Sequence, residues 1–194
     1  MKRQTNGRIG FLGSVASCLI LGACGGSGTG VLDPYGAQVN QFSSLETELS
    51  GLVRTDPANM PQNGSALYEG VALADVSQVT GAGLTVIDTL AADVSVAANF
   101  DTDRIAGVMS GFNSKETGVV DGTLAIAQTD IVGSGYTTTA QGTLTRDGVA
   151  LNTTLDVDGA FGGSGAQMTA GDLTGQASGG ANLLYIAGAY IAKK

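Results

Sequence analysis

The feature that most constrains this chain is a run of strictly alternating residues between Val149 and Phe161. Apolar or small side chains fall on one parity of the run, and mostly polar ones fall on the other. The first set is Val149, Leu151, Thr153, Leu155, Val157, Gly159 and Phe161, and the second is Ala150, Asn152, Thr154, Asp156, Asp158 and Ala160. Because successive strand residues point to opposite faces, the run predicts a strand with one apolar face and one wet face.

Seven further runs are strand-like and are bounded by turns rich in glycine or aspartate. The eight expected strands cover roughly 66–75, 86–100, 104–113, 119–130, 136–146, 149–161, 168–178 and 182–192. The connections are short, and Asp147-Gly148 is a strong hairpin signal, so sequential strands should pair antiparallel. The last strand also needs a partner, and the open edge of the first is the simplest one. The sequence therefore predicts an all-β fold, an eight-stranded antiparallel up-and-down β-barrel.

The front of the chain has the pattern of a bacterial lipoprotein signal. Three basic residues lie within Met1–Arg8, and the uncharged apolar run that follows ends in LGAC at 21–24. This run is too short to span a membrane. We therefore expect residues 1–23 to be a signal peptide, with Cys24 as the lipid-attachment site. Cys18 follows a poorer version of the same pattern and would leave with the signal.

A tether is expected between Cys24 and the barrel. The GGSGTG that follows the cysteine suits a lipid-anchored domain better than an ordinary secretory signal or an uncleaved anchor. Apolar residues at helical spacing predict a short helix over 42–53, which could lean on the barrel or plug one end. Two prolines then mark a boundary. The expected organisation is tether and linker over 24–63 and the barrel domain over 64–194.

Charge and cysteine content limit the functions open to the mature chain. Cleavage before Cys24 would leave 171 of the 194 residues and no cysteine pair for a disulfide. It would also remove three of the nine basic residues, leaving six against 17 acidic ones and a net charge near −11. Such a chain is repelled by nucleic acid and by anionic membrane surfaces. Solubility is a sufficient explanation for the acidity.

The sequence indicates no catalytic, cofactor or metal site. Histidine is absent, which removes Ser-His-Asp and Cys-His machinery and imidazole metal ligands. The remaining candidates are Asp101 with Asp103, Asp156 with Asp158, Tyr185, Tyr190 and the GGSG cluster at 162–165. The acidic pairs lack the spacing of a calcium loop and should be solvated. The tyrosines should pack in the core or at a rim, and the glycines should form turns.

Several motifs resemble those of the β-barrel domain of transferrin-binding protein B-like lipoproteins. GSALYEG at 64–70 is similar to the opening Y-x-G strand, and Asn99-Phe100 with the following Ile105-Ala106-Gly107 is similar to a hairpin of that family. The glycines and Phe161 between 159 and 171 resemble its G-x-F signature. YIAKK at 190–194 is similar to its closing F-G-A-K-K. The resemblance covers residues 64–194.

The resemblance implies a surface-exposed lipoprotein whose eight-stranded barrel is packed inside. Family members capture host iron or haem proteins, or complement factors, through exposed loops and a handle region. This chain has room for one barrel and at most a vestigial handle at 42–64, so transferrin is not the expected ligand. No partner-contact residue carries over, which leaves the ligand-binding residues unknown. We expect a non-enzymatic, lipid-anchored binding protein of the outer membrane or cell surface that engages a protein or solute through its loops.

Three other functions each require a particular feature of the sequence. A lipocalin-like periplasmic carrier needs a hollow barrel, which small inward residues such as Ala98, Gly122 and Ala140 allow, although they equally allow a flattened, packed one. A secreted β-solenoid or adhesin fragment needs a fixed sequence period, and the strand spacings vary. An integral outer-membrane barrel needs an apolar outer face, whereas the outward positions here are largely polar. Gly25 is not an aspartate retention signal, which favours the outer membrane.

Overall fold

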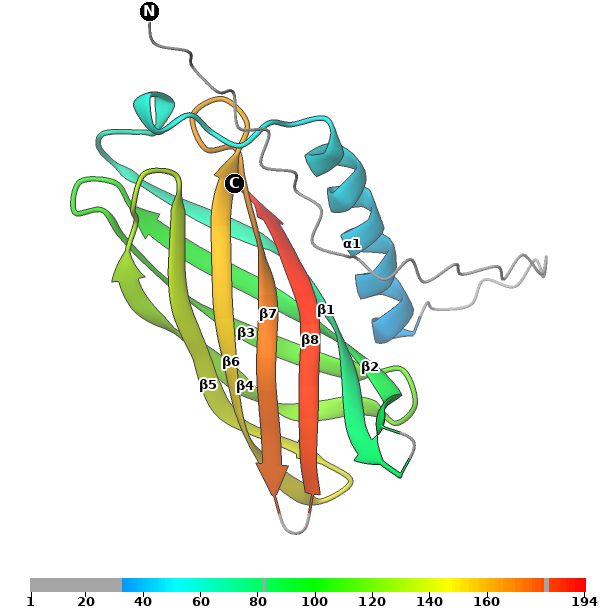
Figure 1. Ribbon diagram of the computed structural model, residues 1–194. Coiled ribbons are helices and arrows are strands. Elements are labelled where there is room, and N and C mark those ends of the chain that lie inside the picture. The colour runs from blue at the N-terminus through cyan, green and yellow to red at the C-terminus, as the bar shows by residue number, and fades with distance from the viewer. Residues whose placement is uncertain (1–32, 82, 180–181) are drawn as a thin grey trace, which may run out of the picture. The chain divides into compact units, whose positions relative to one another are not determined.

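The computed structural model describes residues 33–81, 83–179 and 182–194. The predicted signal peptide, Cys24 and the glycine tether lie outside these residues. Eight antiparallel strands close into a barrel in chain order, which confirms the predicted fold class (Figure 1). The strands are β1 (Ser65–Thr80), β2 (Gly83–Asn99), β3 (Arg104–Ser114), β4 (Gly118–Asp130), β5 (Gly135–Arg146), β6 (Val149–Gly162), β7 (Met168–Gly179) and β8 (Asn182–Lys193).

Closure takes place where the last strand meets the first. β8 pairs with β7 on one side and with β1 on the other, from Glu69 opposite Lys193 to Gln78 opposite Leu184. The predicted Asp147-Gly148 turn joins β5 to β6, and both residues have positive φ, 50° and 76°. This is the type I′ geometry that matches the twist of paired strands. A closed barrel of this topology also excludes the solenoid alternative.

The helix differs from its prediction. We expected it over 42–53, but α1 runs from Pro34 to Ser50. Asp33 caps its first turn by accepting a hydrogen bond from the Gly36 N–H at 2.7 Å, and Pro34 occupies the first helical position. Asp33-Pro34, within the expected linker, is a turn signal in sequence, yet the same pair starts a helix well, because proline has no N–H to leave unpaired there. Part of the expected linker is therefore ordered on the barrel.

α1 lies along the outside of the barrel wall and is attached near both of its ends (Figure 1). Phe42 and Leu45 bury their side chains in a second, smaller core formed with Val71, Met168, Ala170 and Ile191. Near the start of the helix, Gln38 Nε2 donates to Asp93 Oδ1 at 2.9 Å and to the Gly111 carbonyl at 3.0 Å. Near its end, Glu48 accepts a charged hydrogen bond from Lys193 at 2.8 Å.

β1 and β2 form a longer hairpin than predicted. They pair as far as Thr80 opposite Gly83, with a bulge beside Val76. β3 joins β2 only from Leu90 onwards, and β8 reaches β1 only as far as Gln78. The β1–β2 hairpin therefore projects beyond both neighbouring strands.

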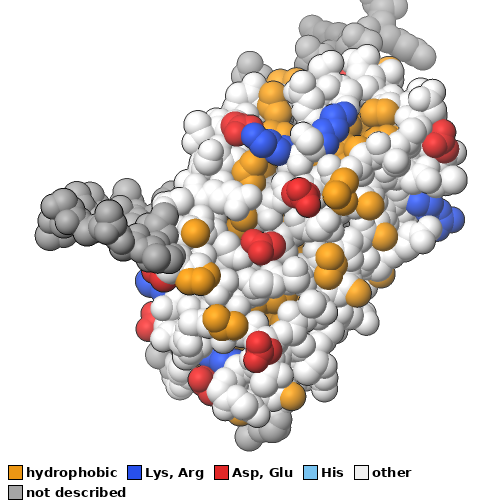
Figure 2. Space-filling model, turned by 180° about the vertical axis from the view of Figure 1, so that it is seen from behind, with side chains coloured by type: hydrophobic (Ala, Val, Ile, Leu, Met, Phe, Trp, Pro, Cys, Tyr) orange, Lys and Arg blue, Asp and Glu red, His pale blue; other side chains and the backbone are white. Residues whose placement is uncertain are grey.

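The interior of the barrel is filled by side chains. The largest fully buried ones include Tyr68, Tyr190, Phe161, Met109 and Leu124. Phe161 is the centre of an aromatic cluster, with ring centroids 5.6 Å from Tyr136, 5.7 Å from Tyr68 and 6.0 Å from Phe100. On the outside, the face shown in Figure 2 carries hydrophobic side chains in separate small groups among scattered charges. The core predicted from the alternating pattern is thus the inside of the barrel.

Candidate binding surfaces at the two barrel ends

The two ends of the barrel are built differently. At one, here called the hairpin end, tight turns join β1 to β2, β3 to β4, β5 to β6 and β7 to β8. At the other, the loop end, longer connections join β2 to β3, β4 to β5 and β6 to β7, and the chain from α1 enters β1. A ligand that binds the connecting loops, and not the strands of the barrel wall, must bind at one of these two ends.

The entry segment 51–64 lies across the loop end and closes it. Thr55 donates from its backbone N–H to the Phe161 carbonyl at 2.9 Å and from its hydroxyl to the Gly163 carbonyl at 2.7 Å. Arg54 Nε donates to the Ser134 hydroxyl at 3.0 Å, which ties the segment to the β4–β5 connection as well. Because the anchoring groups are buried or part-buried, the segment is a fixed part of this end.

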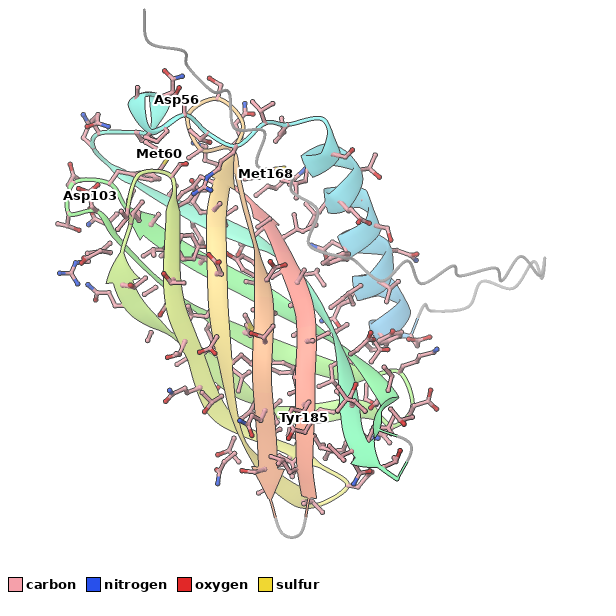
Figure 3. All side chains as sticks on the ribbon, in the orientation of Figure 1. Asp56, Met60, Asp103, Met168 and Tyr185 are labelled. Atoms are coloured by element: carbon pink, nitrogen blue, oxygen red, sulfur yellow. The ribbon has the colours of Figure 1, made fainter. Side chains whose placement is uncertain are left out.

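The outer surface of the loop end is polar and charged, with exposed valines at Val53 and Val132. Figure 3 labels Asp56 and Asp103 at this end, with the buried Met60 between the entry segment and the core. Arg104 pairs with Asp130 at 2.8 Å in an exposed ion pair. Val132, in the β4–β5 connection, has 75% of its surface exposed. An exposed valine among charged groups on rigidly held connections is suited to contact with another macromolecule.

The hairpin end carries most of the exposed large hydrophobic residues of the described chain. Each of its four turns is flanked by at least one. We call this set the apolar rim: Val79, Leu84, Val86, Ile87, Val119, Val149 and Leu183. Leu84 and Val79 are direct cross-strand neighbours, at 62% and 61% exposure. Clustered exposed apolar residues on a soluble domain normally mark an interaction surface.

Inside the apolar rim, a buried ion pair closes the mouth of the barrel. The Asp88 side chain has no solvent-exposed surface, and its Oδ2 accepts from Arg146 Nη1 at 2.8 Å and from the Ser114 hydroxyl at 2.6 Å. Its Oδ1 accepts from the backbone N–H groups of Thr89 at 2.7 Å and Glu116 at 3.3 Å. Apart from the Thr89 bond, which lies within β2, these bonds link β2 to the ends of β3 and β5 and to the β3–β4 turn. The charge is thus fully compensated, as burial requires.

Little free space remains between the two ends. The two best-formed cavities lie in the half of the barrel nearer the hairpin end, and each has a volume of about 20 Å³. That is room for about one water, and the lining is apolar. A carrier of lipocalin type needs a cavity for its ligand, so the interior observed here argues against that alternative. Ala98 and Ala140 are buried in the packed core, as expected for a filled barrel, whereas Gly122, also expected to face inward, is exposed.

The other half of the interior contains a tyrosine cluster. Tyr136 and Tyr190 share a hydroxyl–hydroxyl hydrogen bond, and Tyr136 also bonds the Thr169 hydroxyl at 2.7 Å. The Tyr68 hydroxyl donates to the Ala166 carbonyl at 2.7 Å. Burial raises the pKa of all three phenols above the ordinary value of 10. All three phenols are buried and hydrogen-bonded, Tyr136 and Tyr190 to each other and Tyr68 to a backbone carbonyl, so this cluster stabilises the core.

The residues singled out from sequence lie apart from one another. Both acidic pairs, 101 with 103 and 156 with 158, are exposed as expected. Tyr190 is a core residue, and Tyr185 lies half-exposed on the outer wall, toward the hairpin end (Figure 3). No cluster of three or more acidic side chains able to hold a metal is present among the described residues. None of the helices in the described part of the chain is long and apolar enough to cross a membrane.

Sequence reasoning missed the apolar rim. A signal was present in QVTGAGLTVI at 78–87, where apolar residues stand on both sides of a glycine turn and two of them are adjacent. Adjacent apolar residues cannot share one face of a strand, so one of them must be exposed or lie in a bulge.

No protein-family model matches the sequence, and no curated protein matches it. Among solved structures, the chain is similar to intact Ap-TbpB with its N and C lobes, at 20% identity and a TM-score of 0.46. It is also similar to a point mutant of the vaccine antigen transferrin binding protein B from Haemophilus parasuis Hp5, at 22% identity and a TM-score of 0.46. Each match covers 72% of this chain and 28% of the other.

Both structures are of transferrin-binding protein B, the family whose barrel domain the sequence motifs resemble. The chain corresponds to 28% of the length of these larger proteins, and what the whole proteins bind is not transferred to it by the match.

Proposed function

We propose that this protein is a lipid-anchored binding protein of the outer membrane or cell surface that holds a protein partner on its loop end. It performs no chemistry on that partner. Cys24 carries the lipid, and the barrel serves as a rigid base for the connections at the loop end.

The filled interior is the observation that carries this proposal. Among the described residues the two best-formed cavities measure about 20 Å³ each, too little for a solute, so recognition takes place on the outside of the barrel. The loop end offers a fixed surface for it, because hydrogen bonds from Thr55 and Arg54 hold the entry segment against two connections. A rigid surface loses little conformational entropy on binding.

The charge of the loop end suggests the chemistry of the partner. Asp56, Asp101 and Asp103 are exposed there, and Arg104 is already paired with Asp130. The exposed Val132 supplies an apolar contact beside them. A partner with a basic surface around a small apolar depression complements this arrangement, and charge complementarity speeds its association.

Site-specific crosslinking on intact cells tests the proposal. A photo-crosslinking amino acid is placed at Val132 or, as a matched control, at Val119, a 69% exposed valine at the hairpin end. External protease is applied in parallel. We expect the barrel to be accessible to protease, and we expect position 132 to capture a protein added from outside while position 119 does not. Capture at 119 alone would contradict the assignment of the loop end, and full protection from protease would contradict surface display.

A further inference from the structure

The apolar rim is unusual because of where it stands on the molecule. Its seven members account for most of the eleven exposed large hydrophobic residues in the described chain, and all of them lie within a few residues of the four turns. Val119 is 69% exposed and Leu84 62%. Apolar side chains on strand ends beside the turns at one end of a domain can enter the interfacial layer of a bilayer, where such groups insert about 5–10 Å.

The start of α1 places the proposed anchor beside this same end. Gln38 Oε1 accepts a hydrogen bond from Asn113 Nδ2 at 3.0 Å, and Asn113 directly precedes the β3–β4 turn. Figure 1 shows the beginning of α1 close to that turn, with the helix running from there toward the loop end. Glu48, near the other end of the helix, pairs with Lys193. Because 17 helical residues span about 25 Å, the loop end lies farther from the start of the helix by roughly that distance.

The length of chain before α1 limits how far the barrel stands from the lipid. Cys24 precedes Asp33 by nine residues, which reach at most about 30 Å when fully extended. A tether of this length is long enough for the hairpin end to touch the membrane surface. The loop end could reach the surface only if the barrel turned over on its tether.

We propose that the hairpin end rests on the bilayer, with the apolar rim in the interfacial layer and the loop end directed away from the membrane. This inference rests on the proposed lipid attachment at Cys24. It adds an orientation: the lipid holds the protein at the membrane, and the apolar rim determines which end of the barrel faces it.

Fluorescence quenching by lipid tests this orientation with the lipidated full chain. Once Cys24 is acylated, a cysteine introduced as Val119→Cys or Val132→Cys is the single free thiol of the mature protein. Each is labelled with an environment-sensitive dye and reconstituted in phosphatidylcholine vesicles with brominated acyl chains. We expect loss of most of the emission at position 119 and little loss at position 132. Replacing both Leu84 and Val86 with serine in the Val119→Cys protein should restore most of the emission, because these exposed side chains contribute to insertion but not to folding.

The possible outcomes distinguish this orientation from the proposed lipid attachment at Cys24, on which it rests. Protein that does not enter the vesicle fraction would overturn lipid attachment, and the orientation with it. Membrane-bound protein with equal quenching at the two positions, or stronger quenching at 132, would overturn the orientation alone. Quenching at 119 that persists after the serine substitutions would show that the apolar rim does not hold the barrel to the lipid, and would also overturn the inference.

Discussion

The ion pair between Asp88 and Arg146 gives a sharp test of how the hairpin end is held closed. We consider Arg146→Met, which keeps much of the aliphatic side chain and removes the guanidinium. The Asp88 side chain is fully buried, so the substitution leaves an uncompensated carboxylate in the barrel mouth. Breaking a buried pair from one side costs about 3–5 kcal/mol.

Two features of the site place this substitution at the low end of that range. The Arg146 side chain is 21% exposed, so water already reaches part of the pair. Asp88 also keeps its hydrogen bonds from Ser114, Thr89 and Glu116. We therefore expect a loss of about 3 kcal/mol in the free energy of unfolding. For a domain of this size, such a loss lowers the melting temperature by about 6–12 °C.

Urea denaturation followed by circular dichroism measures this loss, within a double-mutant cycle with Asp88→Asn. The double variant removes both charges, so it should be more stable than the sum of the single effects predicts, by at least about 1 kcal/mol. Arg104→Met is the matched control, because Arg104 forms an exposed pair with Asp130 and should cost under about 1 kcal/mol. A loss below about 1 kcal/mol for Arg146→Met, or a coupling energy near zero, would refute the view that the pair holds the mouth closed.

Three further predictions concern the core and the helix. In thermal melts, Gly159→Ala should destabilise the barrel by about 3 kcal/mol or prevent folding, because the new Cβ would overlap the Tyr190 hydroxyl and lie 2.5 Å from Tyr136 Cζ. Gly81→Ala is the control and should be neutral, because the space around Gly81 is open. Burial raises the pKa of Tyr136 and Tyr190, so the folded state keeps protons that unfolded tyrosines lose near pH 10. The free energy of unfolding should therefore stay constant below that pH and fall as the pH rises above it. In a pH titration, the phenolate absorbance should appear together with unfolding. Gln38→Ala should cost about 1–3 kcal/mol and speed amide hydrogen exchange in the first half of α1, and unchanged exchange there would contradict its anchoring role.

Local patterns were sufficient to predict the barrel. The alternation around Leu155 and the Asp147-Gly148 turn depend on strand periodicity and turn chemistry, which neighbouring residues determine. The start of the helix was missed because Asp33-Pro34 is equally compatible with a turn and with a capped helix. Contacts with distant residues, such as the packing of Phe42 in one cluster with Ile191 of β8, decide between these two structures.

The candidate surfaces were harder to predict because they depend on contacts between distant residues. The loop end is closed by hydrogen bonds from Thr55 to Gly163 and from Arg54 to Ser134, across 108 and 80 residues of sequence. No short motif encodes such pairs. The apolar rim depends on how far β1 and β2 extend beyond β3, which is a matter of register between strands. Whether the barrel was hollow or filled likewise depended on the combined volume of side chains from all eight strands.

Because β8 pairs with both β1 and β7, the barrel can close only after β8 has been synthesised. As long as β8 has not emerged from the ribosome or from an export channel, β1 has a free edge and the sheet stays open. Closure is therefore the last event of folding, since it joins strands from opposite ends of the domain and is slow for that reason. A barrel of this topology can close only in the compartment that holds both β1 and β8.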